Sequence, residues 1–165
     1  MKILGIDPGT ARMGYSVIEV DSTLVPKMLE TDTIITPAEE EAHKRLRLLY
    51  KKLTEIIAKH QPKIMVIEKL FFNTNVKTAI NVGQARGVAL LSAANKKMFI
   101  YEYTALQAKL VLTGYGRSDK KQMQAAVKDK LGLPEIIKSD DANDALAMAL
   151  CFVQKDFEVF LNGSN

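Results

Sequence analysis

The chain has 165 residues, 47% of them hydrophobic and 25% charged, with a net charge of +4 and a pI of about 9.1. A chain of this length buries enough surface to fold without disulfides or a structural metal. The single cysteine, Cys151, excludes an intrachain disulfide, and two histidines disfavour a zinc site, so any metal needs oxygen ligands. The absence of an 18-residue apolar run or a secretory segment predicts no membrane association and a cytoplasmic location.

The order of apolar runs and turn signals predicts an α/β fold. Strands are expected over residues 2–6, 12–20, 28–36, 63–68 and 98–103. Helices are expected over residues 39–61, 75–95, 105–112, 119–131 and 140–155. The prediction is a mixed five-stranded sheet, three antiparallel strands followed by two parallel ones, flanked by helices in a single domain over residues 1–155. Residues 156–165 are weakly patterned and are predicted to form a weakly ordered tail.

Two of the predicted strands end in an acid. Asp7 follows an apolar run and precedes the strand breaker Pro8-Gly9, and Glu68 follows a second run of the same kind. Because neighbouring parallel strands end at the same edge of a sheet, Asp7 and Glu68 should meet there. The alternative for Asp7 alone is that its side chain caps the turn.

The last long helix brings two further acids. Asp141 and Asp144 are three residues apart and share a helix face. That face continues with apolar residues that direct it toward the protein: Ala145, Met148 and Phe152. Ser139 and Asp140 are interpreted as capping residues, and a role at the helix N-terminus is the alternative for Asp141.

Four converging carboxylates cannot all remain ionised unless a cation neutralises them. Magnesium prefers oxygen ligands and completes its shell with water and phosphate oxygens. Two such ions about 3.5–4 Å apart can activate a water and stabilise the leaving oxygen of a phosphodiester. The pattern therefore indicates a metal-dependent nuclease of the ribonuclease H kind.

The second half of the chain favours a polyanionic partner. Residues 69–101 contain no acid but five bases, and residues 103–130 contain six bases against two acids. Phe71 and Phe72 are adjacent aromatics on a polar loop, which suits stacking on unpaired bases. The alternatives are solvated helix faces and a buried Phe72. The small residues of the helix over 75–95 make it the candidate dimer element.

These residues resemble the RuvC family of bacterial crossover (Holliday) junction endodeoxyribonucleases over residues 1–153. The resemblance is carried by Gly5-Ile-Asp7-Pro-Gly-Thr10 with Gly14-Tyr15, by Val66-Ile-Glu68 before Phe71-Phe72, by Asn75 and Gly83-Gln-Ala-Arg-Gly87, by Gly116 before Lys120-Lys121-Gln122, and by Asp141-Ala-Asn-Asp144-Ala-Leu146. The block Gly83–Gly87, in register with the four acids, is the most specific of these features. Lys69 departs from the glutamine usual in the family, and Asn143 from alanine or threonine.

The resemblance implies a ribonuclease H-like homodimer that resolves four-way DNA junctions in recombination and repair by paired, symmetric hydrolysis. It implies two Mg²⁺ ions per subunit, with Mn²⁺ as a substitute, and a metal-activated water that attacks the scissile phosphate. The family's catalytic and metal-binding acids match Asp7, Glu68, Asp141 and Asp144. The branch-migration proteins RuvA and RuvB are the implied partners, in the bacterial cytoplasm.

The resemblance also places Lys109 and Lys120 beside the DNA and the active site, and Phe71 against bases at the crossover. Lys120 is a further candidate catalytic residue, because a cation near the helix start can hold a phosphate or stabilise developing charge. The complete set of predicted DNA-binding residues is Phe71, Phe72, Lys77, Arg86, Lys109, Lys120 and Lys121.

Three other functions are weighed against this interpretation. A related nuclease would cut RNA–DNA hybrids or other structured nucleic acid. A non-catalytic junction-binding protein would use the acids only as caps, which the presence of all four disfavours. An actin-like phosphotransferase normally needs two such domains, whereas this chain has one.

Overall fold

The computed structural model describes residues 1–21, 23–69 and 76–163, with the side chains of residues 76–78 also outside the described part. Its five strands are β1 (Lys2–Asp7), β2 (Arg12–Val20), β3 (Pro26–Ile35), β4 (Ile64–Glu68) and β5 (Phe99–Tyr103). Its helices are α1 (Ala42–His60), α2 (Val76–Ala94), α3 (Ala105–Thr113), α4 (Lys120–Leu131), α5 (Asp140–Lys155) and α6 (Phe157–Gly163).

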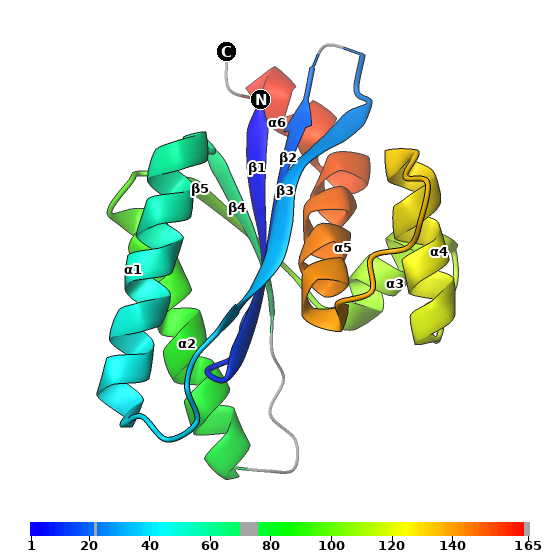
Figure 1. Cartoon of the computed structure of the whole chain (residues 1–165). Coiled ribbons are helices and arrows are strands. Elements are labelled where there is room, and N and C mark those ends of the chain that lie inside the picture. The colour runs from blue at the N-terminus through cyan, green and yellow to red at the C-terminus, as the bar shows by residue number, and fades with distance from the viewer. Residues whose placement is uncertain (22, 70–75, 164–165) are drawn as a thin grey trace.

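The strands form one sheet in the order β3-β2-β1-β4-β5. β1 pairs antiparallel with β2 and parallel with β4, β2 pairs antiparallel with β3, and β4 pairs parallel with β5. This arrangement confirms the predicted mixed sheet. Figure 1 shows α1 and α2 on one face of the sheet and α3 to α6 on the other.

Alternate residues of the central strands fill two separate cores. Leu4 and Ile6 of β1 join the core under α1 and α2, together with Leu49 and Leu53. Ile3, on the opposite face of the same strand, joins the core under α5 and its neighbours. A strand buried on both faces reads as a continuous apolar run, which is why residues 3–6 of β1 and residues 64–67 of β4 carry no polar residue before the terminal acids.

α5 crosses the sheet at two glycines. A Cβ added to Gly5 of β1 would lie 2.0 Å from the carbonyl oxygen of Ala145, and one added to Gly14 of β2 would lie 1.8 Å from that of Asp141. No side chain fits at either position, so these glycines let the helix backbone rest directly on the strands. The contact sets the position of the first two turns of α5.

Two predicted boundaries differ from the structure. α1 begins at Ala42, so Glu39 and Glu40 precede the helix instead of occupying its first turn. Phe157–Gly163 is not part of a weakly ordered tail, because it forms α6. Phe157 and Phe160 are buried and pack edge to face with Phe152 of α5. α6 is too short for a periodic pattern in the sequence to reveal this contact.

We expect Gly5→Ala to lower the free energy of unfolding by at least about 2 kcal/mol, because the added methyl group forces α5 away from the sheet. Gly83→Ala on α2 is the matched control, since a Cβ there has no neighbour within 4 Å. Replacing a helical glycine with alanine should stabilise the protein by up to about 1 kcal/mol. Urea denaturation measures both changes, and a neutral Gly5→Ala would contradict the close contact.

Candidate active site at the carboxylate edge of the sheet

The carboxyl ends of β1 and β4 place two acids side by side. The two strands are parallel, with Ile6 opposite Ile67, so Asp7 and Glu68 end adjacent strands at the same edge. The contact of α5 with Gly14 brings the helix start, with Asp141 and Asp144, to this edge as well. The structure therefore gathers the four acids that the sequence predicted.

The protonation equilibria of these acids show that their charges interact. Burial, followed by the charges of Glu68, Asp144 and Asp141, raises the pKa of Asp7 to about 7. Burial and the charge of Asp144 raise the pKa of Glu68. Burial, followed by the charges of Asp140 and Asp141, raises the pKa of Asp144. An acid cluster of this kind needs either bound protons or a cation to be stable.

Asp7 and Glu68 share a hydrogen bond. This bond raises the pKa of Asp7 while it opposes the rise at Glu68, as expected when protonated Asp7 donates to the carboxylate of Glu68. The shared proton therefore reduces the repulsion between the carboxylates, as a bound cation would.

Carboxylate oxygens are the donors that Mg²⁺ and Mn²⁺ prefer, so the chemistry of the donor set fits a hard divalent ion. Among the described residues, however, no three Asp, Glu, His or Cys side chains stand close enough together to hold one ion. Oδ2 of Asp141 instead accepts a hydrogen bond from Nε of Arg12 at 2.6 Å. The donors are gathered, but their side chains must turn before they can bind one ion together.

Two lysines lie near the acids. The charges of Lys109 on α3 and Lys120 on α4 act against the rise in the pKa of Asp144. Lys120 also forms an ion pair with Asp140 in the first turn of α5. These contacts place both lysines within electrostatic reach of Asp144, as the sequence analysis expected.

Arg86 of α2 holds the end of β4 in place. Its Nε donates to the carbonyl oxygen of Glu68 at 3.3 Å, and its Nη2 forms an ion pair with Glu102 of β5. The side chain is only 23% exposed. Arg86 therefore positions the strand that carries Glu68, a role that the prediction of a DNA contact did not include.

The structure says less about the remaining predicted DNA-binding residues. Lys121 is exposed in the first turn of α4, beside Lys120. Phe71, Phe72 and the side chain of Lys77 lie outside the described residues.

Sequence reasoning missed Arg12 as a partner of the acids and assigned Asp140 to capping alone. Ser139 is the N-cap of α5, as predicted, and accepts a hydrogen bond from the backbone of Ala142 at 3.4 Å. The only hint in the sequence that Arg12 contacts the acids was its position, five residues after Asp7 across a tight turn.

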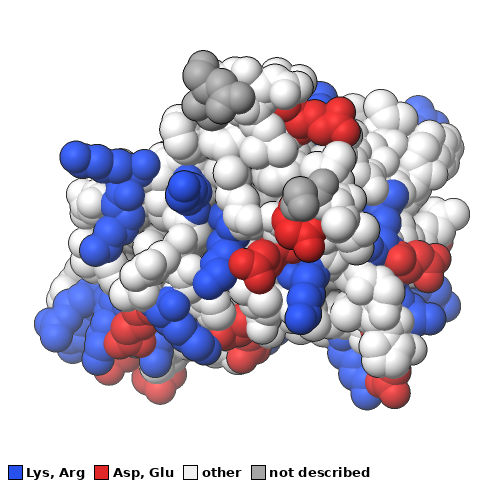
Figure 2. Space-filling model, turned by 90° about the horizontal axis from the view of Figure 1, so that it is seen from above, with Lys and Arg blue, Asp and Glu red and all other residues white. Residues whose placement is uncertain are grey.

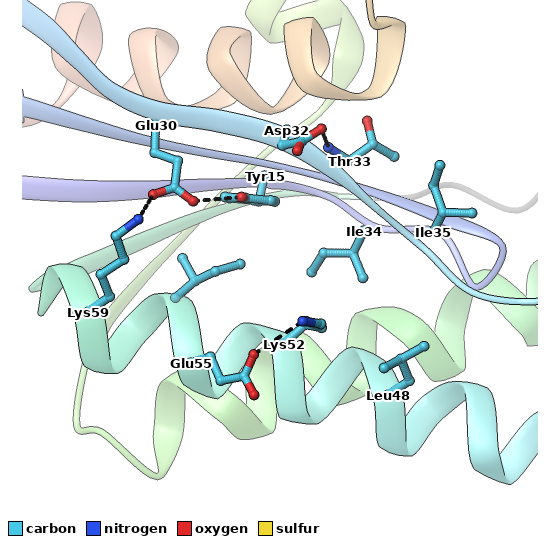
Figure 3. Close-up of a pocket in the computed structure, with 11 residues that line it drawn as sticks. Tyr15, Glu30, Asp32, Thr33, Ile34, Ile35, Leu48, Lys52, Glu55 and Lys59 are labelled. Atoms are coloured by element: carbon cyan, nitrogen blue, oxygen red, sulfur yellow. Dashed lines mark hydrogen bonds and ion pairs between the residues drawn. The ribbon is translucent and has the colours of Figure 1, made fainter.

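A cavity of about 400 Å³ between β3 and α1 is separate from the acid cluster. It is lined by residues such as Tyr15, Ile34 and Lys59, and none of the four acids lies in its wall (Figure 3). Glu30 accepts hydrogen bonds from Tyr15 at 2.8 Å and from Lys59 at 2.5 Å, and it contacts His60 at 2.7 Å. These three partners lower the pKa of Glu30 to about 2. The network ties β2 and β3 to the end of α1.

Basic side chains are not confined to the acid-bearing edge. Figure 2 views the opposite end of the molecule, where Lys and Arg also gather on the side of α1, with acids among them. Net charge alone therefore does not locate a nucleic-acid surface. The lysines beside Asp144 are the more specific indication. In the described part of the chain, no helix is both long and apolar enough to cross a membrane.

Comparison with known proteins gives one consistent family. Residues 3–152 match the family described as crossover junction endodeoxyribonuclease RuvC. A protein of that name from Alkaliphilus oremlandii is 50% identical over 151 residues, 92% of each chain. The structure "T. thermophilus RuvC in complex with Holliday junction substrate" is 30% identical with a TM-score of 0.88, covering 93% of each chain. The yeast mitochondrial Holliday junction resolvase Ydc2, at 11% identity and a TM-score of 0.69, shares the fold and covers 99% of this chain and 84% of its own.

We expect Asp7→Asn to stabilise the protein when no divalent metal is present. Between about pH 4 and pH 7 the folded protein keeps a proton on Asp7 that the unfolded chain has released, so the free energy of unfolding falls as the pH rises. Asp7→Asn lacks this fall, and its advantage should grow to about 2–4 kcal/mol at pH 7 and then stay constant.

Urea denaturation in EDTA at pH 4.5, 6, 7 and 8 measures the effect. Glu39→Gln, at an exposed acid outside the cluster, is the control and should change stability equally at each pH. An advantage for Asp7→Asn that does not depend on pH would show that Asp7 is ionised throughout.

Proposed function

Because the chain belongs to the RuvC family of crossover junction endodeoxyribonucleases, we propose that the four clustered acids form the catalytic and metal-binding centre of this Holliday junction resolvase. The chain is a nuclease that hydrolyses phosphodiester bonds at DNA junctions in recombination and repair. The observation that supports the proposed centre is the convergence of Asp7, Glu68, Asp141 and Asp144, three of them with raised pKa values. We transfer the four-way junction substrate from the complex of the Thermus relative.

Nucleases of this family are metal-dependent. For this chain we propose two Mg²⁺ ions per subunit, replaceable by Mn²⁺. Their ligands are Asp7, Glu68, Asp141 and Asp144. When bound, such ions polarise a phosphodiester and lower the pKa of water, which makes hydrolysis feasible at neutral pH. The carboxylates hold the reacting groups in line, and they need no proton of their own once the cations neutralise them.

Lys109 and Lys120 stabilise the substrate next to the acids. Their charges already interact with Asp144, so a phosphate bound at the cluster lies within reach of both. Lys120 acts as the catalytic cation, because the charge on the phosphate oxygens increases during attack. Its partner Asp140 releases it when the more highly charged phosphate is present, since an ion pair this exposed is weak.

The other proposed DNA contacts are Phe71, Phe72, Lys77, Arg86 and Lys121. The aromatic pair would stack on bases at the crossover, where unpaired bases expose their faces. Lys121 extends the basic surface beyond Lys120. Arg86 acts chiefly on the position of Glu68, and therefore affects cleavage more than DNA affinity.

α2 is the proposed dimer contact. Apart from Asn81, its exposed residues recur at alternating intervals of four and three: Ile80, Gln84, Gly87, Leu91 and Ala94. Ile80 and Leu91, two large apolar side chains on this face, are 56% and 54% exposed. This spacing matches the seam of a helix pair, and Gly87 permits close approach. A twofold dimer would present two acid clusters to the two symmetric strands of a junction.

The family also suggests RuvA and RuvB as partners and the bacterial cytoplasm as the location. The nuclease domain is proposed to span residues 1–155, and α6 packs against its core.

A labelled synthetic four-way junction tests the function directly. With Mg²⁺, the protein should introduce paired symmetric nicks in the junction, while a linear duplex and an RNA–DNA hybrid stay intact. Cutting of the hybrid alone would keep the metal site but overturn the substrate. Binding without cutting, in Mg²⁺ and in Mn²⁺, would indicate a junction-binding protein instead.

We expect Glu68→Gln to retain the fold and junction binding but to lose more than about 100-fold in cleavage rate, beyond the loss typical of residues behind the metal ligands. The amide keeps the size of the side chain and removes the charge that a cation needs. Single-turnover cleavage and circular dichroism measure the two properties. The exposed Glu55→Gln on α1 is the control, and near wild-type cutting by Glu68→Gln would exclude Glu68 as a ligand.

We expect Leu91→Glu to convert the dimer into a monomer, because the two copies would bring buried charges together at the seam. Light scattering after size-exclusion chromatography measures the mass in solution. Val159→Glu on α6 is the control, since Val159 is 69% exposed and lies on the other side of the sheet. A Leu91→Glu protein that remains dimeric would place the interface elsewhere.

A further inference from the structure

We propose that Arg12 is the counter-ion of Asp141 in the metal-free enzyme, and that it exchanges this carboxylate for a DNA phosphate when divalent ions bind. The inference rests on the proposed metal site at the four acids. Arg12 is then a positioning residue for Asp141 and a link between metal binding and substrate binding.

The contact between Arg12 and Asp141 follows from the backbone. Arg12 and Gly14 are two residues apart on β2, so the side chain of Arg12 points to the same face of the sheet on which Gly14 lacks one. The lack of a side chain at Gly14 lets the backbone of Asp141 rest against the strand. The side chain of Arg12 therefore reaches the first turn of α5, and its Nε donates to Oδ2 of Asp141 at 2.6 Å.

This ion pair occupies an oxygen that a metal ion would need. The charge of Asp141 still raises the pKa of Asp7, so the carboxylate lies within electrostatic range of the cluster. Yet no three candidate ligands among the described residues are close enough to bind one ion. Turning Asp141 from Arg12 toward the cluster would supply a further ligand. Arg12 thus competes with the cation for Asp141.

A divalent ion at moderate concentration should displace Arg12 from Asp141. The Arg12 side chain is 52% exposed and that of Asp141 is 24% exposed, and ion pairs at such positions are weak. The pair is nevertheless useful before metal binds, because it neutralises one of four carboxylates that otherwise repel one another.

The released guanidinium remains at the edge that carries the acids. It is permanently charged, and its planar donors match the oxygens of a phosphate. Arg12 opens β2 directly after the tight turn from Asp7, so it stays beside the site at which the phosphodiester binds. The ligand that fits it is a DNA phosphate neighbouring the scissile one. Metal and DNA should therefore strengthen each other's binding.

Calorimetric titration with Mn²⁺ alone tests the competition. Arg12→Gln should bind Mn²⁺ about three- to fivefold more tightly than the wild type, a gain that structural damage would not produce. Arg47→Gln, at an exposed arginine of α1, is the matched control and should leave the affinity unchanged. Equal or weaker binding by Arg12→Gln would overturn the proposal.

Nuclear magnetic resonance tests whether the contact itself exchanges. Asp141→Asn removes the carboxylate and defines the Nε–H signal of released Arg12. Adding Mg²⁺ to the wild type should move the signal toward that position. A signal that does not move while the metal binds would make Arg12 only a background charge and overturn the exchange.

Junction binding with and without Ca²⁺ tests the second half of the exchange. Arg12→Gln should weaken binding about threefold when Ca²⁺ is present and should have little effect in EDTA, where Arg12 is held by Asp141. An equal loss in both conditions would make Arg12 a fixed DNA contact and overturn the exchange.

Glu68→Gln separates this proposal from the metal site on which it rests. Loss of Mn²⁺ binding in that variant establishes the site independently of Arg12. If Glu68→Gln instead binds Mn²⁺ like the wild type, the metal site fails, and the exchange fails with it.

Discussion

The contact between α5 and the two central strands is the constraint on which the site depends. At Gly5 and Gly14 the helix backbone lies where a side chain would otherwise be. Because the helix is rigid, this contact fixes the first turn of α5 relative to the ends of β1 and β4. The four acids come from three elements far apart in the sequence, and they meet only because the helix lies this close to the sheet.

The fold thereby places several carboxylates where their negative charges are energetically unfavourable. Desolvation of Asp7, Glu68 and Asp144, together with the charges of neighbouring acids, raises the pKa values of these carboxyl groups. A protein selected for stability alone would replace such acids with apolar residues. The structure instead reduces the repulsion with a proton shared by Asp7 and Glu68 and with two cations, Arg12 at Asp141 and Lys120 at Asp140. Exchange of these partners would suit the metal-binding centre that we propose for the four acids.

The face of the sheet that carries α1 and α2 serves a different purpose. The buried alanines of α2, Ala85, Ala89 and Ala93, let the helix pack close to its neighbours. Its opposite side exposes Ile80 and Leu91. Arg86 connects this helix to Glu68 through the end of β4. A subunit contact at α2 would therefore lie one side chain away from Glu68, one of the acids of the proposed centre.

The sequence alone determined the fold class and the identity of the four acids. Apolar runs that end in Asp7 and Glu68 mark buried parallel strands, and the spacing of Asp141 and Asp144 marks one helix face, because strand and helix periodicity are local properties. The matching motifs determined the family. Tertiary structure alone decided which cations contact the acids, that Arg86 supports Glu68, and that Phe157 and Phe160 anchor a final helix. These features depend on side chains that meet across distant segments, and no periodic pattern records such a meeting. The ion pair of Arg12 and Asp141, 129 residues apart, is the clearest example, since it exists only because Gly14 lets the two backbones touch.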